Sequence, residues 1–182
     1  HEFSHSDYDL IYFNILEAQD FSVPSQRKRV FISNKKLKPP DHKFSVSVGD
    51  AFRSLPDPNT ELFNHELVPL SPRIAKKIHQ TPPGGALVYF KGSHGRTYRN
   101  YIRLQLDRSC PTVMGKSRFI HPTDSRLCTV REHARLMSYP DSYLFQGPLD
   151  WQFNQVGESV PPLVAKVIGH QVLASFRENE SI

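Results

Sequence analysis

Proline constrains this chain more than any other residue type. Its 182 residues include 15 prolines against 9 glycines. Proline fixes its own φ angle, lacks a backbone N–H group and disfavours helical conformation in the residue before it. The sequence therefore predicts many fixed turns and argues against long uninterrupted helices.

The composition limits the class of protein. Hydrophobic residues make up 38% of the chain, which is enough for one lean core. No apolar run approaches the roughly 18 residues that a membrane span needs. The two cysteines, Cys110 and Cys128, cannot form a disulfide framework and fit a reducing compartment. We expect a cytoplasmic, intracellular protein of mixed α/β class with no membrane association.

Positive charge is concentrated in one part of the chain. Residues 91–118 hold seven Lys and Arg residues and one acid, whereas the whole chain has a net charge of only +5. Aromatic residues are interleaved with these cations, a combination that suits phosphate contacts and base stacking. The pattern predicts nucleic-acid binding, and a solvated face of a β-rich region is the alternative. The candidate DNA-binding residues are Arg96, Arg99, Arg103, Arg108, Lys116 and Arg118.

Local patterns predict the first secondary-structure elements. Residues 8–15 and 29–33 are rich in aromatic and β-branched residues, so we expect a buried strand followed by an antiparallel partner. A short helix is expected over residues 48–55. Residues 86–120 indicate strands and turns.

Capping residues predict where three later helices begin. Ser71-Pro72 is a strong helix start. Thr129 and Glu132 have capping-box spacing, with Val130, Ala134 and Met137 as the apolar stripe. The last helix should start after Ser159 and run to about Phe176.

Three segments together resemble conserved blocks of the DNA (cytosine-5) methyltransferases. They are Ala18 with DFSVPSQRKRVFI at residues 20–32, RLCTVREHARLMSYPDSY at residues 126–143 and QVGESVPPLVAKVIG at residues 155–169. They resemble the eighth, ninth and tenth blocks, in the family's order. The region between the first two resembles a target-recognition domain, so the chain looks like the C-terminal portion of such an enzyme.

The resemblance implies a fold and a division of the chain. The fold would be the C-terminal edge of a Rossmann-like methyltransferase domain plus a small mixed target-recognition domain. Residues 4–40 would supply strands of the catalytic domain. Residues 41–145 would form the recognition domain, including the ninth block, and residues 146–182 would return to the catalytic domain with the C-terminal helix.

The resemblance also implies a chemistry, known from restriction-modification systems. Family members flip a cytosine out of duplex DNA, attack its C6 atom with a cysteine thiolate and transfer a methyl group from S-adenosylmethionine to C5. Arg29 would hydrogen-bond the flipped base at O2, and Arg27 would support the pocket or a flanking phosphate. The cofactor-binding residues would be Gly157, Glu158, Ser159 and Val160.

The chain departs from the family at several positions. Glu158 stands where the family usually has Asn, and serines at positions 22 and 138 stand where it has Gly. Ser25 stands in place of the usual Gln. Since a carboxylate beside the methionine carboxylate is unfavourable, these changes bear on cofactor affinity more than on the fold.

The family's Pro-Cys nucleophile is missing. Cys110 precedes Pro111, which is the reverse order, and Cys128 follows Leu127. We therefore expect the chain to be inactive by itself and to act with an N-terminal methyltransferase portion, present as a separate chain or a missing segment. The histidines at 94, 121 and 133 fit no zinc spacing with the cysteines, so no metal is expected.

Two alternatives to a methyltransferase part stay open. One is a non-catalytic, sequence-selective DNA-binding or regulatory module derived from the family. The other is an interaction protein that self-associates, because Leu163, Val164, Val167 and Ile168 would lack a catalytic core to cover.

Overall fold

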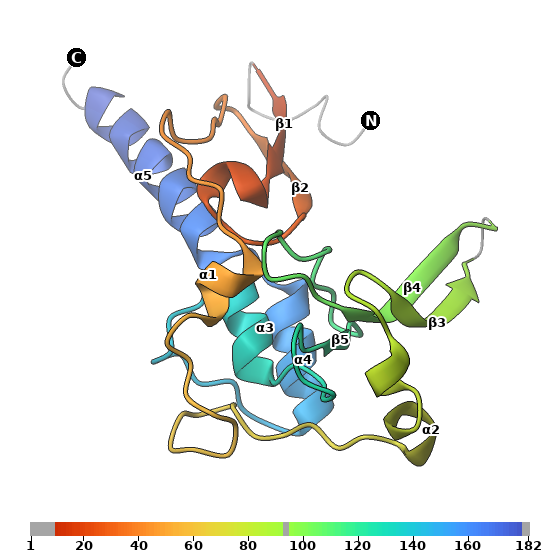
Figure 1. Cartoon of the computed structure of the whole chain (residues 1–182). Helices are drawn as coiled ribbons and strands as arrows, with labels where there is room; N and C mark the ends of the chain where they lie inside the picture. Colours follow the sequence, from red (N-terminus) through yellow and green to blue (C-terminus); the bar gives the residue numbers. More distant parts are fainter. Residues whose placement is uncertain (1–9, 93–94, 180–182) are drawn as a thin grey trace.

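A computed structural model describes residues 10–92 and 95–179 of the chain (Figure 1). Its helices are short except for the last one, as the prolines predict. The elements, in order, are β1 (Tyr12–Glu17), η2 (Ala18–Phe21), β2 (Lys28–Ser33), α1 (Val48–Phe52), α2 (Pro72–Ala75), η3 (Ile78–Gln80), β3 (Ala86–Lys91), β4 (Thr97–Arg103), β5 (Phe119–Ile120), α3 (Val130–Leu136), α4 (Leu149–Glu158) and α5 (Pro162–Asn179). None of the helices in these described ranges is long and apolar enough to cross a membrane.

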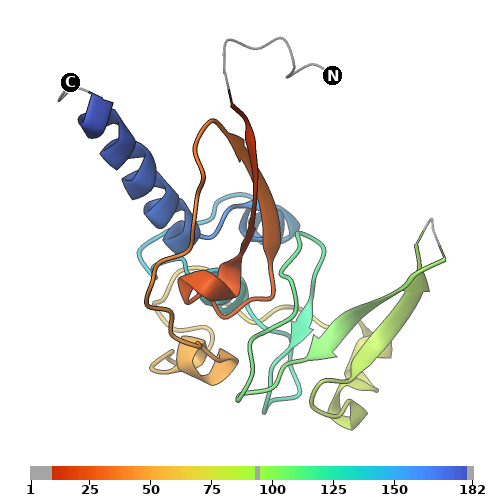
Figure 2. The ribbon, with the colours of Figure 1, turned by 90° about the horizontal axis from the view of Figure 1, so that it is seen from above.

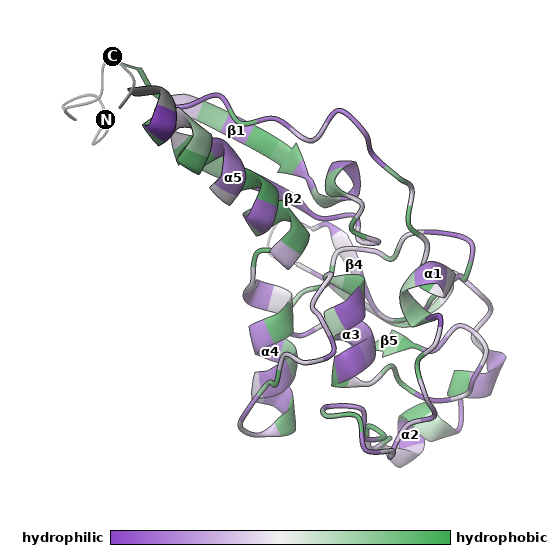
Figure 3. Cartoon of the chain, turned by 90° about the vertical axis from the view of Figure 1, so that its left-hand side faces the viewer, coloured by the Kyte–Doolittle hydropathy of each residue, from purple (hydrophilic) through white to green (hydrophobic). Residues whose placement is uncertain are grey.

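The predicted antiparallel pair at the start of the chain is confirmed. β1 pairs with β2, with Phe13 opposite Ile32 and Ile15 opposite Val30. One face of this hairpin packs against α5, which lies alongside it in Figures 2 and 3, and buries Leu16. The prediction that the first strand is buried is wrong for the other face, where Phe13 and Ile15 are 66% and 62% exposed. Residues 8 and 9 of that expected strand lie outside the described residues.

A second sheet has the order β3-β4-β5. β3 and β4 form an antiparallel hairpin, and β5 pairs with β4 in parallel. The hairpin projects away from the helices, as Figures 1 and 2 show. The main hydrophobic core lies between this sheet and helices α3 and α4, and its largest fully buried aromatic residues are Phe145 and Phe153.

The predicted helix starts depend on local capping bonds. Ser71 caps α2 by accepting a hydrogen bond from the N–H of Ile74. Thr129 and Glu132 form a reciprocal capping box at the start of α3, which buries Val130 and Ala134 as predicted. α2 is only four residues long, because the chain turns into η3 after Lys76.

The C-terminal region holds two helices where the sequence predicted one. α4 ends at Glu158, and α5 begins at Pro162. Pro161 and Pro162 explain the break, because proline has no N–H group and disfavours helical conformation in the residue before it. The missed helix α4 has a signal in the spacing of Leu149, Phe153 and Val156, the last two of which are buried.

Candidate functional site

Arg27 is an internal clamp. Its side chain is only 1% exposed. Nη1 donates to the Val113 carbonyl at 2.6 Å, and Nη2 donates to the Ser159 carbonyl at 2.8 Å. Burial lowers the pKa of Arg27 to about 10, so the guanidinium stays charged at neutral pH. The clamp joins the start of β2, the loop before β5 and the link between α4 and α5.

Arg29 has a different environment. It lies within β2, is exposed, and donates through Nη1 to the carbonyl of Lys28 at 2.8 Å. Arg27 and Arg29 therefore do not present two cations to one side of β2. Arg27 precedes the regular strand and turns inward to meet two carbonyls, so the alternation of a strand does not govern its direction.

Arg29 borders a hollow of about 590 Å³, which we call the Arg29 hollow. The segments around it come from β2, the β3–β4 hairpin, the loop before β5 and the end of α4. The structure therefore brings Arg29 together with Gly157 and Glu158 of the tenth block. The other lining residues are Phe90, Tyr98, Met114, Gly115 and Lys116.

Gly157 allows α4 to approach the loop before β5 closely. A Cβ atom at this position would lie 2.2 Å from the backbone N of Gly115 and 2.2 Å from the carbonyl C of Met114. Both neighbours are main chain and cannot move aside cheaply. The glycine is thus required for packing between two segments of the chain, which builds one wall of the Arg29 hollow.

Arg103 does not belong to an exposed cationic surface. It is 6% exposed and donates to four carbonyls, those of Thr81, Ile78, His121 and Asp124, at 2.7–2.8 Å. The prediction that Arg103 contacts DNA is wrong, because its N–H groups are hydrogen-bonded to the turns around β4 and β5.

The other five candidate DNA-binding residues differ in exposure. Arg118 is mostly enclosed, with Nη2 2.5 Å from Asp150 and its guanidinium 3.8 Å from the centre of the Phe153 ring. The remaining four are exposed: Arg96, Arg99, Arg108 and Lys116. Arg99 and Arg108 line a smaller hollow with Gln26 on a different part of the surface from the Arg29 hollow.

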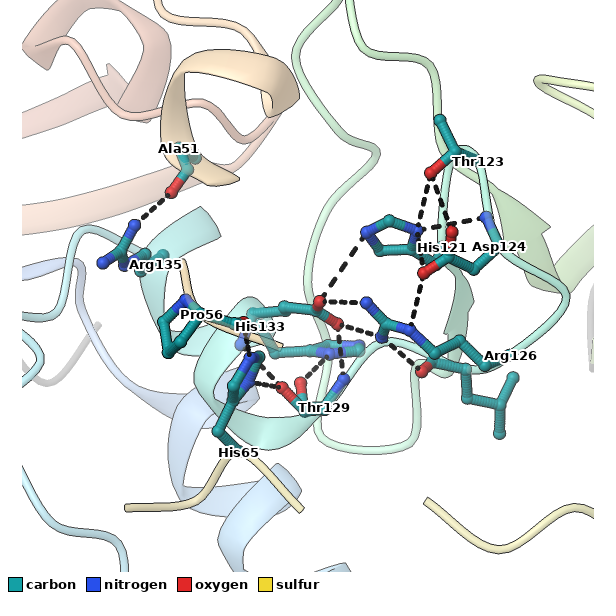
Figure 4. A network of polar contacts seen from close by, with 12 residues as sticks. Ala51, Pro56, His65, His121, Thr123, Asp124, Arg126, Thr129, His133 and Arg135 are labelled. Atoms are coloured by element: carbon teal, nitrogen blue, oxygen red, sulfur yellow. Dashed lines mark hydrogen bonds and ion pairs between the residues drawn. The ribbon is translucent and has the colours of Figure 1, made fainter. Parts of the chain in front are cut away.

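The ninth-block residues form an internal polar network, part of which Figure 4 shows. Glu132 accepts two hydrogen bonds from Arg126, at 2.8 and 2.9 Å, rather than pairing with Arg131 or Arg135. Arg131 donates to the carbonyls of Phe63, Pro140 and Tyr143. These contacts hold α3 to the loops on either side of it and to the segment around Phe63.

The chain is similar in sequence to a known protein family over nearly its whole length. The model of the C-5 cytosine-specific DNA methylase family matches residues 1–174. This chain belongs to that family. A protein of Methanocaldococcus jannaschii, named as the type II methyltransferase M.MJ0563P, is 44% identical over 162 residues, which are 89% of this chain and 51% of that protein.

Two further relatives agree with this match. The type II methyltransferase M1.HphI of Haemophilus parahaemolyticus is 35% identical over 87% of this chain and 46% of its own length. The chain thus spans about half the length of these curated relatives. The type II methyltransferase M.AquIB of Picosynechococcus sp. is 37% identical over 63% of this chain, and that match covers 89% of M.AquIB.

The fold is also found among solved structures. A crystal structure named as a prophage-encoded DNA modification methyltransferase of E. coli superposes with a TM-score of 0.69 at 23% identity. It covers 89% of this chain and 59% of the other chain. This likeness confirms the predicted α/β methyltransferase fold.

Two serines of this family member stand at positions that favour glycine. Ser22 has φ 59° and Ser138 has φ 63°, both in the left-handed region. Their hydroxyl groups accept hydrogen bonds from the N–H groups of Phe44 and Leu163. These hydrogen bonds offset part of the free-energy cost of the left-handed backbone. The serines can therefore adopt the conformation that glycine adopts more easily.

C-5 cytosine methyltransferases use S-adenosylmethionine as methyl donor, and the described residues do not by themselves fit a site for it. Ser159 donates its hydroxyl to the Val156 carbonyl, and its own carbonyl accepts from Arg27. At the start of α5, Pro162 has no N–H group, and the N–H of Leu163 is bonded to Ser138. Of the four predicted cofactor residues, only Gly157 and Glu158 line the Arg29 hollow.

Both cysteines of the chain are buried. Desolvation raises the pKa of Cys110 to about 12 and raises the pKa of Cys128 well above its usual range. A thiol held neutral in this way is a poor nucleophile, so both side chains serve as apolar packing. His94, named above among possible ligands, lies outside the described residues.

Proposed function

We propose that this chain is the C-terminal part or subunit of a DNA (cytosine-5) methyltransferase, which binds duplex DNA and supplies one wall of the pocket for the flipped cytosine. The supporting observation is the Arg29 hollow. It joins the arginine of the eighth block to the end of α4 in the tenth block, two segments far apart in the sequence. Arg29 would bind the base at O2, and Arg27 would position the walls without touching the base.

Exposed cations support duplex binding. Arg96, Arg99, Arg108 and Lys116 lie on the recognition region, residues 41–145, and their side chains are open to solvent. Cations that neutralise phosphates release counterions, so binding should weaken steeply as salt rises. Sequence readout would come from the part of this region that reaches base edges.

An exposed apolar face on the β1–β2 hairpin is an argument for a partner segment that covers this face. Phe13, Ile15, Val30 and Ile32 lie on one face of the β1–β2 hairpin and are 47–66% exposed. Residues 4–40 would be strands of the catalytic domain, whose remaining portion would cover this face and bring the Pro-Cys nucleophile. The full cofactor site would also form only with that portion, because the described residues leave it incomplete.

The site of self-association expected from α5 is largely occupied. Val164 is 3% exposed, and Val167 and Ile168 pack against the hairpin core. Leu163 stays 39% exposed on α5, so self-association of the isolated chain would use the open hairpin face together with that exposed part of α5. Light scattering should show self-association of the isolated chain, and a one-to-one complex once a partner fragment covers that face.

Reconstitution of activity tests the proposal. The chain would be mixed with the part of M.MJ0563P that lies outside the match, in-vitro amplified genomic DNA and tritiated S-adenosylmethionine. We expect methyl transfer to cytosine by the mixture and none by either part alone. Background incorporation with this and other relatives' complementary parts would overturn the enzymatic proposal.

Arg29→Ala and Lys28→Ala form a matched pair for the same assay. Arg29→Ala should lower the rate by about 10²-fold, the usual loss when one stabilising donor is removed. Lys28 is the neighbouring exposed cation on the opposite face of β2, where its Nζ lies 2.7 Å from Glu17. Its replacement should leave the rate nearly unchanged, which separates base binding from a general effect of charge.

A second candidate is a non-catalytic DNA-binding module of the same family. The burial of both cysteines favours it, because neither described thiol can act as nucleophile. This candidate predicts salt-sensitive binding of the chain alone to duplex DNA, together with no methyl transfer in any mixture. Gel shifts that show no affinity at low salt would reject it.

A further inference from the structure

We infer that Phe90 and Tyr98 form a stacking surface for an unpaired nucleobase at the Arg29 hollow. The inference rests on the proposed function and adds a ligand-binding element from the β3–β4 hairpin to the same site. Base–aromatic stacking is tolerant of sequence, because every base has a flat π-face. The pair would therefore hold a base that has left the duplex stack, whatever its identity.

The two rings are paired across the hairpin. Phe90 lies opposite Tyr98 in the β3–β4 register. Their ring centres are 5.6 Å apart, and their planes are inclined by 20°. The two side chains are 49% and 40% exposed, so the stacked pair still has open aromatic surface. Exposed rings of this kind bind bases at a low entropic cost only when they are already held in place.

Two contacts hold the pair in place. The Tyr98 ring covers Gly92, where a Cβ atom would lie 2.4 Å from the ring carbon Cε2. Asn100, on the same hairpin face, donates to the carbonyl of Lys116 and accepts from the N–H of Arg118. The hairpin is thereby tied to the loop that borders the Arg29 hollow, and the rings are kept at its rim.

The hollow has the chemistry of a nucleotide site. Phe90, Tyr98 and Met114 give it apolar surface for a base, while Arg29 and Lys116 give it positive charge for a phosphate or a base oxygen. Glu158 is the one acid among its lining residues. The other face of the hairpin carries Tyr89, which lies opposite Arg99 and points away from this pair.

Binding of single strands by the full chain tests the inference. The probes are an oligonucleotide of about 12 thymidines and an abasic oligonucleotide of equal length and charge, at one fixed salt concentration. We expect the thymidine strand to bind more tightly. Phe90→Ala and Tyr98→Ala should each weaken it by about 5- to 150-fold while leaving the abasic strand unchanged.

Two control variants sharpen the result. Tyr89→Ala removes an exposed aromatic residue from the opposite hairpin face and should leave the affinity ratio of the two probes unchanged. Tyr98→Phe keeps the ring and should bind as the unaltered chain does. Thermal unfolding followed by circular dichroism would verify that each variant is folded.

The outcomes separate this inference from the proposed function. Equal binding of both probes by the unaltered chain, or an unchanged ratio in Phe90→Ala and Tyr98→Ala, overturns the stacking surface while DNA binding stands. Binding of neither probe at low salt, together with no affinity for duplex DNA, overturns the proposed DNA binding itself and the inference with it.

Discussion

Gly157 in α4 and Gly115 in the loop before β5 are in backbone contact, with room for no side chain at position 157. A Cβ atom there would lie 2.2 Å from the Gly115 nitrogen. The same contact forms a wall of the Arg29 hollow. Both the packing of the chain and the shape of its candidate site therefore require a residue without a side chain at position 157.

Gly157→Ala should therefore destabilise the fold by about 1–3 kcal/mol, the usual cost of forcing extra atoms into a packed region. Gly169→Ala is the matched control, since a Cβ at Gly169 in α5 would have no neighbour within 4 Å. It should stabilise the helix by about 0.5–1 kcal/mol, because alanine loses less backbone entropy than glycine. Urea unfolding of both variants measures the difference, and equal stabilities would contradict the close contact.

Replacement of the buried Arg27 should separate the two arginines of the eighth block. Arg27→Met removes both donors to the carbonyls of Val113 and Ser159, and we expect a loss of about 2–4 kcal/mol in unfolding free energy. Arg29→Met removes an exposed side chain and should change it by less than about 0.5 kcal/mol. Similar losses in both variants would show that the clamp is not specific to Arg27.

Acid should weaken the fold through His133. Burial lowers the pKa of His133 to about 4, and its ring is stacked on Phe119 at 5.1 Å. The unfolded chain, with a histidine pKa near 6.5, binds the proton more readily. Stability is thus complete above about pH 6.5 and falls as the pH drops through about 4, by about 2 kcal/mol between about pH 7 and pH 5.

His133→Phe provides the control for this pH dependence. The variant keeps a ring between Phe119 and Phe153 and removes the titrating group, so the slope of stability against pH should flatten between about pH 5 and pH 6.5. Burial also lowers the pKa of His121, which contributes in the same direction and leaves a smaller residual slope. A slope as steep as that of the unaltered chain would assign the effect to other groups.

The buried Glu132 should contribute far more to the free energy of unfolding than the exposed Asp124, which contacts the same arginine. Glu132 is 2% exposed, accepts both Arg126 donors and caps α3, so Glu132→Gln should cost about 3 kcal/mol. Asp124 also contacts Arg126, at 2.9 Å, but its side chain is 50% exposed. Asp124→Asn should therefore cost less than about 1 kcal/mol. Urea unfolding of both variants decides the ranking, and a reversed order would place the stabilising pair at the surface.

A single glycine substitution should stabilise the chain. Ser54 follows α1 with φ 63° and is exposed. Ser54→Gly relieves the left-handed backbone and should raise the unfolding free energy by about 0.5–1 kcal/mol. Ser22→Gly should gain less, because its hydroxyl accepts from the N–H of Phe44, 22 positions away, whereas the Ser54 hydroxyl donates only to the carbonyl of the adjacent Arg53. Melting temperatures measured side by side test this, and an equal gain would mean that the Ser22 hydroxyl contributes nothing.

Local sequence patterns were enough to predict where two helices begin and to identify the family. The start of α3 at Thr129 and the start of α2 at Ser71 follow from hydrogen bonds that span three residues, so neighbouring sequence is enough to predict them. The antiparallel β1–β2 pair follows from two consecutive β-rich segments, residues 8–15 and 29–33, and the ordered blocks identify the methyltransferase family. The density of charged residues located the basic region but did not show which of its arginines are exposed to solvent.

Long-range packing set the surroundings of individual charged residues and the composition of the site. Arg27 meets carbonyls 86 and 132 positions away, and Arg103 meets carbonyls of turns on either side of β4. Sequence patterns report which residues are neighbours along a helix or strand, whereas burial depends on which distant backbone groups need a donor. For this reason the sequence did not predict that Arg27 is a buried clamp. It also did not predict that Arg29, Glu158 and two aromatic rings line one hollow.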